Sequence, residues 1–142
     1  MVFMKKHLIP YAVTVVIFFV IDILWLGAVA GSLYSDYLAF HLAEEPLWSA
    51  AIGFYLIFLV GLFSFAILPS AREGDPWTTA SKKGAAFGFF TYMTYDLTNL
   101  ATLKHWSSTI ALIDIVWGTC LNASVAGLSF FFARYWYNRY AG

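Results

Sequence analysis

Three aspartates interrupt long apolar stretches of this chain. Asp22, Asp96 and Asp114 lie in the segments VIDILW, TYDLTN and LIDIVW. A carboxyl group among apolar side chains can act as a general acid when it is protonated, and as a base or a cation ligand when it is ionised. We therefore take these three residues as the candidate catalytic residues.

The composition indicates an integral membrane protein. Of the 142 residues, 61% are apolar and 11% are charged, whereas soluble domains carry about 25% charged residues. A net charge of zero gives no basic surface, so nucleic acid is not an expected partner. The single cysteine, Cys120, rules out a disulfide within one chain.

Four apolar runs are long enough to cross a hydrocarbon core of about 30 Å, which needs about 20 helical residues. We place them at about 8–31, 48–68, 84–103 and 109–133. Each run must be helical, because an open strand would leave its backbone groups unpaired in lipid. The predicted fold class is all-α: an integral membrane four-helix bundle that forms one domain over residues 1–142, with the last two helices as an antiparallel hairpin.

The Lys and Arg residues predict the orientation of the bundle. Seven of the eight fall on one side of the four predicted spans: Lys5, Lys6, Arg72, Lys82, Lys83, Arg134 and Arg139. Lys104 alone lies on the other side. Because Lys and Arg accumulate in cytoplasmic loops, both termini are expected to be cytoplasmic.

A common depth connects the three aspartates. A rise of about 1.5 Å per residue places Asp22 and Asp96 about 18 to 20 Å from the cytoplasmic ends of their helices. Asp114 comes about 8 to 10 Å below the outer end of its helix, which is nearly the same level. A charged side chain at such a depth costs about 2.5 to 3.5 kcal/mol unless it faces a partner or a cavity. One carboxylate layer in the outer half of the membrane is therefore expected.

Polar and aromatic side chains accompany each aspartate at helical spacing. They are the candidate substrate-binding residues Trp25, Tyr92, Tyr95, Asn99, Trp117 and Asn122. On the third predicted helix, Gly84 and Gly88 form a GxxxG pattern, which is typical of closely approaching membrane helices.

A short sequence echo relates the first and last predicted helices. I-D-I-L-W begins at Ile21 and I-D-I-V-W begins at Ile113. The two helices run in opposite directions, so a duplication would be an inverted one, of the kind whose site lies at the repeat interface in some transporters. Five residues are too few to establish a duplication, and we favour convergence. In either case the spacing places an indole N–H near a carboxylate.

The combination of Y-D-L-T-N from Tyr95, the following Trp106, D-I-V-W-G from Asp114 and D-I-L-W-L from Asp22 resembles a bacterial membrane family catalogued as domain of unknown function 2177. The similarity spans nearly the whole chain. It implies a small four-helix protein of the bacterial inner membrane, and it implies no particular reaction or site residue.

Three functions fit the carboxylate layer, whose members cannot all stay ionised without a compensating cation. In the first, the layer binds or transforms a lipid-like or other apolar small molecule, with one Asp as acid and another as base. In the second, it binds protons or a metal ion, since the aspartates and Asn99 offer oxygen ligands, which His41 and His105 could join from the outer rim. Such a transporter would require a homo-oligomer.

In the third, the aspartates fix helix packing or dock the bundle onto a larger membrane complex. We favour the first function, with membrane lipid as the surrounding partner. The chain shows no nucleophile motif, phosphate-binding glycine loop or nucleotide signature that would indicate a cofactor.

Overall fold

The computed structural model describes residues 2–30 and 45–140, and all of its regular structure is helical. Four long helical segments follow one another, two of them interrupted or extended by a π-helical turn. They are α1 (Val2–Trp25) with η1 (Leu26–Ala30), α3 (Trp48–Leu62) with η2 (Phe63–Ile67) and α4 (Leu68–Glu73), α5 (Trp77–Thr102), and α6 (Ser108–Arg139). The predicted all-α class with four helices is confirmed.

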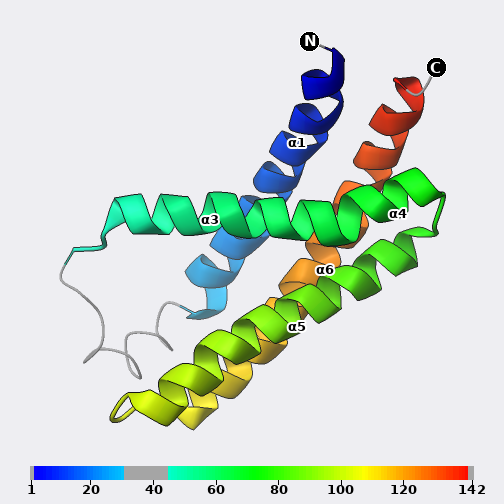
Figure 1. Cartoon of the computed structure of the whole chain (residues 1–142). Coiled ribbons are helices and arrows are strands. Elements are labelled where there is room, and N and C mark those ends of the chain that lie inside the picture. Colours follow the sequence, from blue (N-terminus) through cyan, green and yellow to red (C-terminus); the bar gives the residue numbers. More distant parts are fainter. Residues whose placement is uncertain (1, 31–44, 141–142) are drawn as a thin grey trace.

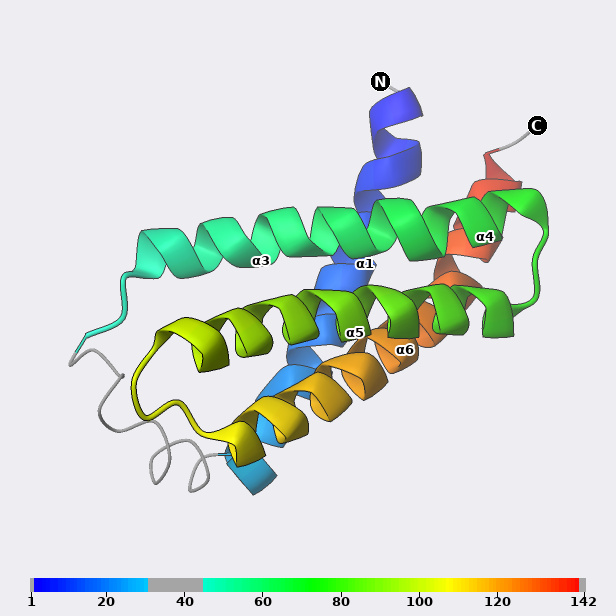
Figure 2. The ribbon, with the colours of Figure 1, turned by 60° about the horizontal axis from the view of Figure 1, so that its bottom comes forward.

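Both termini lie at one end of the bundle (Figure 1). Helices α5 and α6 are joined by residues 103–107 and lie side by side in both views, as the predicted hairpin requires (Figures 1 and 2). Helix α1 packs against α6. The α3–α4 segment meets α5 at the turn that joins them, and the two diverge toward the start of α3 (Figure 1).

Three of the described helices are long and apolar enough to cross a membrane, over Lys6–Ala28, Trp48–Glu73 and Ser108–Arg139. The fourth, α5, has 26 residues but is less apolar. Its first two turns carry threonine, serine and two lysines, and the rest of the helix carries Asp96, Asn99, two tyrosines and four threonines. Helices α5 and α6 also extend beyond the predicted 84–103 and 109–133. The apolar pattern marks the part of a helix in hydrocarbon, whereas the helix itself continues into the polar interface.

The contact between α5 and α6 depends on small residues. A Cβ atom at Gly84 would collide with the Asn122 carbonyl oxygen, and one at Gly88 would collide with the Gly118 carbonyl oxygen. From the opposite side, Gly118 is covered directly by the ring of Tyr92. The predicted close approach at the GxxxG pattern is therefore confirmed, and it brings the two backbones nearly into contact.

The two tryptophans of the sequence echo meet where α1 crosses α6. The rings of Trp25 and Trp117 are stacked, with centroids 4.1 Å apart and an interplanar angle of 9°. Closer to the termini than this stack, Phe18 and Leu121 belong to the apolar core that α1 and α6 share with the end of α3. The echoed motifs thus form the contact between the first and last helices.

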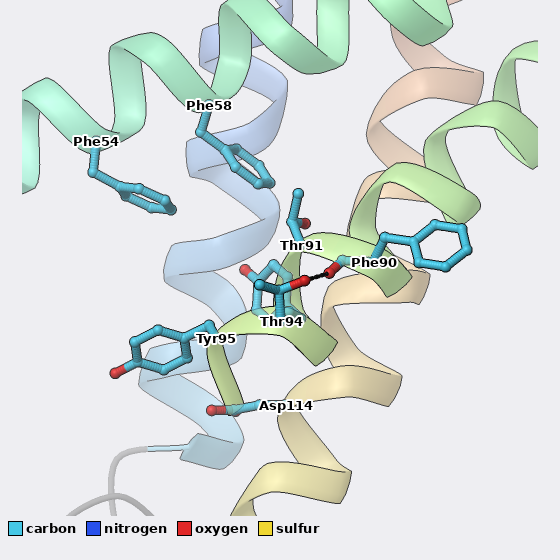
Figure 3. Close-up of a pocket in the computed structure, with 8 residues that line it drawn as sticks. Phe54, Phe58, Phe90, Thr91, Thr94, Tyr95 and Asp114 are labelled. Atoms are coloured by element: carbon cyan, nitrogen blue, oxygen red, sulfur yellow. Dashed lines mark hydrogen bonds between the residues drawn. The ribbon is translucent and has the colours of Figure 1, made fainter. Parts of the chain in front are cut away.

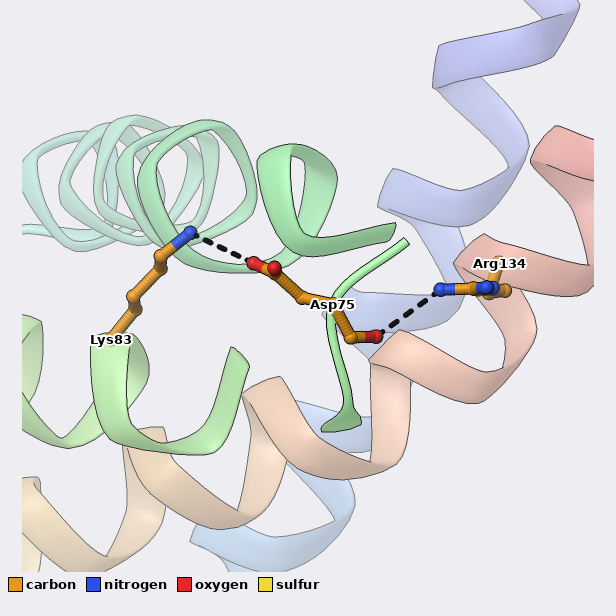
Figure 4. A network of polar contacts seen from close by, with 3 residues as sticks. All are labelled: Asp75, Lys83 and Arg134. Atoms are coloured by element: carbon orange, nitrogen blue, oxygen red, sulfur yellow. Dashed lines mark hydrogen bonds and ion pairs between the residues drawn. The ribbon is translucent and has the colours of Figure 1, made fainter. Parts of the chain in front are cut away.

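Basic residues hold the end of the bundle that carries the termini. Gly74 ends α4 in the left-handed conformation, at φ 81°. The next residue, Asp75, accepts a hydrogen bond from Arg134 Nη1 on its carbonyl oxygen at 3.1 Å, and its carboxylate pairs with Lys83 Nζ at 3.4 Å (Figure 4). Lys6 Nζ donates to the Tyr140 carbonyl oxygen at 3.3 Å. Lys6, Lys83 and Arg134, which the sequence predicts on one side of the membrane, thus lie together with Asp75 at one end of the bundle.

Replacing Gly88 by alanine is expected to lower the free energy of unfolding by about 1 to 3 kcal/mol, because the added methyl group must push α5 away from α6. Gly53→Ala is the matched control, since a Cβ there meets nothing within 4 Å, and a helical Gly→Ala change is neutral or stabilises by up to about 1 kcal/mol. Denaturation in mixed detergent micelles measures both. Equal stability of the two variants would contradict the close contact.

Candidate functional site

A cavity of about 710 Å³ lies where α3 and α5 diverge, with α6 behind them. Phe54 and Phe58 are one helical turn apart, so both side chains leave the same face of α3 and point toward α5 (Figure 3). Asp114 of α6 lies near Tyr95 at the far end of the same view (Figure 3). The lining residues are Phe54, Phe58, Phe90, Thr91, Tyr92, Thr94, Tyr95 and Asp114.

Few polar groups of this lining are available to a ligand. The hydroxyl of Thr91 donates to the Phe87 carbonyl oxygen at 2.8 Å, and that of Thr94 donates to the Phe90 carbonyl oxygen at 2.6 Å. Both donors are thus used within α5 itself. The Asp114 carboxyl group and the hydroxyls of Tyr92 and Tyr95 are the other polar side-chain groups of this otherwise apolar wall.

Tyr92 connects the three predicted aspartates. Its side chain packs on Gly118 and on Phe58, whose ring centroid is 6.4 Å from its own. All three carboxyl groups, of Asp22, Asp96 and Asp114, lie within electrostatic reach of its hydroxyl. The structure therefore gathers the aspartates of α1, α5 and α6 around one side chain.

Asp22 is tied to neighbouring helices. It is 8% exposed, and the Trp117 indole of α6 and the Tyr55 hydroxyl of α3 both donate side-chain hydrogen bonds to it. Asp22 thus accepts hydrogen bonds from both flanking helices, and it is not among the residues that line the cavity. This contact also uses Trp117, one of the predicted substrate-binding residues.

Asp96 is the most deeply buried of the three, with no exposed surface. Among the described residues, no donor forms a hydrogen bond of good geometry with either of its carboxylate oxygens. Its polar neighbours are the Trp106 indole, which approaches as a donor, and the carboxyl group of Asp114. Asp96 thus neighbours Asp114 but is not among the residues that line the cavity.

The predicted substrate-binding residues divide into two groups. Tyr92 and Tyr95 line the cavity. The other four are not among the residues that line the cavity: Trp25, Asn99, Trp117 and Asn122. Trp25 and Trp117 are instead stacked on each other. The two asparagines have other contacts, since Asn122 Nδ2 donates to the Gly118 carbonyl oxygen at 2.7 Å and Asn99 hydrogen-bonds the Tyr95 side chain.

The aromatic wall was missed by the sequence analysis. Phe54, Phe58 and Phe90 stand in apolar runs, where a residue that faces lipid and one that faces a cavity have the same pattern. The four-residue spacing of Phe54 and Phe58 is the one signal that could have paired them.

No metal-binding group is formed in the part of the chain that the structure describes. Nowhere among these residues do three His, Cys, Asp or Glu side chains come close enough to hold an ion. His105 is exposed in the α5–α6 turn, at φ 62°. His41 lies outside the described residues. The three aspartates thus surround Tyr92 without converging as one set of metal ligands.

A family model described as "Predicted membrane protein (DUF2177)" matches residues 7–131. This range includes nearly all of α1 and most of α6, together with the cavity and the three aspartates. Neither the curated proteins nor the solved structures provide a significant match. The chain belongs to the predicted membrane protein family DUF2177.

Proposed function

We propose that this chain is a four-span protein of the bacterial inner membrane that binds a lipid-like or other apolar small molecule in the cavity between α3, α5 and α6. The observation that carries the proposal is an apolar cavity of about 710 Å³ with the carboxyl group of Asp114 in its wall. Ligand sites are typically apolar hollows of about 300 to 1,000 Å³ with a few placed polar groups.

The polar group gives such a site its selectivity. Inside a bilayer, an apolar molecule gains little by leaving lipid for an apolar cavity, because lipid tails are as apolar as leucine side chains. A hydrogen bond from a ligand hydroxyl or amine to Asp114 would be stronger than the same bond in water, since the surroundings have a low dielectric constant. Phe54 and Phe58 would then hold the apolar body of the ligand.

The proposed orientation places both termini on the cytoplasmic side. Lys6, Lys83 and Arg134 are held at the end of the bundle with the termini, whereas Lys104 lies in the α5–α6 turn at the other end (Figure 1). We count α5 as the fourth span because its buried glycines pack along α6, which places it at the same depth. Asp114 then lies about 9 Å below the outer end of α6.

The three aspartates receive different roles under this proposal. Asp114 contacts the ligand, and Asp22 is a positioning residue that accepts hydrogen bonds from both Trp117 and Tyr55. Asp96 acts on the ligand through Asp114, its charged neighbour.

Asp114→Asn should weaken binding of 1-aminoanthracene about fivefold, because a charge-assisted hydrogen bond from the amine becomes a neutral one. Anthracene, which has no amine, is the matched control and should bind both proteins equally. Fluorescence titration of the purified protein in detergent measures both constants.

Thr94→Trp should reduce binding of both probes by filling the cavity, while circular dichroism checks that the helices persist. An equal effect of Asp114→Asn on the two probes would contradict the role of the carboxylate. Unchanged binding in Thr94→Trp would show that the probes bind elsewhere.

Asp22→Leu is expected to cost about 1 to 3 kcal/mol of unfolding free energy, because it leaves the donors on Trp117 and Tyr55 buried without their acceptor. Asp22→Asn should cost less, since the amide oxygen can still accept. Denaturation in mixed micelles gives both values. Stability that is unchanged in Asp22→Leu would mean that this aspartate does not hold the helices.

A second candidate function is proton binding by the pair formed by Asp96 and Asp114. It is favoured by the complete burial of Asp96, whose oxygens lack full hydrogen bonds among the described residues. Buried carboxylates at mid-membrane depth commonly mark proton relays. A bundle of only four helices leaves little room for a transport path, so this function would involve an oligomer.

Proteoliposomes with an enclosed pH dye distinguish the two candidates. If the protein carries protons, a potassium diffusion potential should drive acidification that Asp96→Asn abolishes and Asp22→Asn retains. The proposed small-molecule function predicts no flux above empty liposomes for any of these proteins.

A further inference from the structure

A second hollow lies on the other side of the α3–α4 segment, against α1. One part, of about 570 Å³, is an apolar groove with Leu8 and Tyr11 on one wall and Phe63 on the other. An adjoining part, of about 520 Å³, is bordered by Glu73 and Tyr137. The two parts share Ser64, Leu68 and Arg72 in their walls. An arginine thus stands at the junction of an apolar groove and a polar recess.

Positive charge is concentrated at this junction. Lys6 Nζ lies 4.0 Å from the centroid of the Tyr137 ring, and the Arg72 guanidinium lies 5.7 Å from the same centroid. His7 lies within electrostatic reach of both cations. The ring holds the two cations in place without neutralising them. The recess also contains one carboxylate, that of Glu73. The two positive charges of Lys6 and Arg72 exceed this single negative charge, so the site favours binding of an anion.

The junction also lies at the level of a membrane surface. The apolar segments Lys6–Ala28 and Trp48–Glu73 both end here, which puts Lys6 and Arg72 at the boundary of the hydrocarbon. Lipid phosphates occupy this level, and basic residues beside it attract anionic lipids by about 1 kcal/mol each. The groove below the cations then runs at the depth of acyl chains.

We infer that this hollow is a binding site for an anionic glycerophospholipid. The guanidinium of Arg72 and the ammonium of Lys6 bind the phosphate group, for which a guanidinium offers paired donors. One acyl chain lies in the groove between α1 and η2, along Leu8, Tyr11 and Phe63. A soluble phosphate compound would satisfy the cations and leave the apolar groove empty, so the groove favours the lipid.

The site is separate from the Asp114 cavity, and its test does not depend on the proposed function. The full chain is purified in a neutral detergent and titrated with phosphatidylglycerol, with phosphatidylcholine as the uncharged comparison and glycerol 3-phosphate as the soluble one. Native mass spectrometry counts the bound molecules and yields each dissociation constant.

Phosphatidylglycerol should bind more tightly than phosphatidylcholine. Arg72→Gln should weaken its binding about fivefold, and the double change with Lys6→Gln about 25-fold, since each cation contributes about 1 kcal/mol. Arg139→Gln is the matched control: it removes the same charge from an exposed residue at the same end and should leave binding unchanged. Arg72→Lys keeps the charge and should lose less than Arg72→Gln.

A bulky residue in the groove tests the acyl chain separately. Leu68→Trp should weaken binding of phosphatidylglycerol while both cations remain, and denaturation without lipid confirms that the variant is folded. Equal loss in Arg139→Gln and Arg72→Gln would overturn the site, because it would show attraction by net charge alone. Tight binding of glycerol 3-phosphate, with no effect of Leu68→Trp, would overturn the lipid and assign the cations to a soluble phosphate compound.

Discussion

The contact between the backbones of α5 and α6 is the constraint on which the rest of the structure depends. Gly84 and Gly88 let the two helices approach until side chains other than hydrogen would collide. The same close approach places the Tyr92 ring directly on Gly118. The ring thus fills the space that a side chain at position 118 would occupy. Without this close approach, Asp96 of α5 and Asp114 of α6 would lie farther apart. The absence of side chains at Gly84, Gly88 and Gly118 thus determines where the carboxyl groups meet.

Helix α1 packs against α6 through the motif that the two helices share, I-D-I-L-W in α1 and I-D-I-V-W in α6. Trp25 and Trp117 stack at the crossing, and the second of them also donates a hydrogen bond to Asp22. Tyr55 brings α3 to the same carboxylate. Asp22 is therefore stabilised by donors from two neighbouring helices, whereas Asp96 and Asp114 neighbour each other. This division explains how three carboxylates can share a region without forming one metal site among the described residues.

Much of the fold could be predicted from the sequence because bilayer thickness dictates the length of an apolar run. The GxxxG spacing likewise predicted the α5–α6 contact. The cavity could not be predicted, because it depends on how far α3 tilts away from α5, and no local pattern specifies that angle. Phe58 is an example, because its apolar sequence neighbours are as compatible with a side chain that faces lipid as with one that lines a cavity. The hydrogen-bond partner of Trp117 could not be predicted either. Its spacing from Asp114 suggested a partner in the same helix, whereas its indole donates a hydrogen bond to Asp22 of α1.

The central claim is that the cavity beside Asp114 holds an apolar molecule in the native membrane. The most direct measurement is an experimental structure of the protein extracted with its native lipids, without exchange into pure detergent. We expect continuous density between Phe54 and Tyr95, with a polar atom within about 3.2 Å of the Asp114 carboxylate. A cavity closed by movement of α3 onto α5, with no density between them, would contradict it.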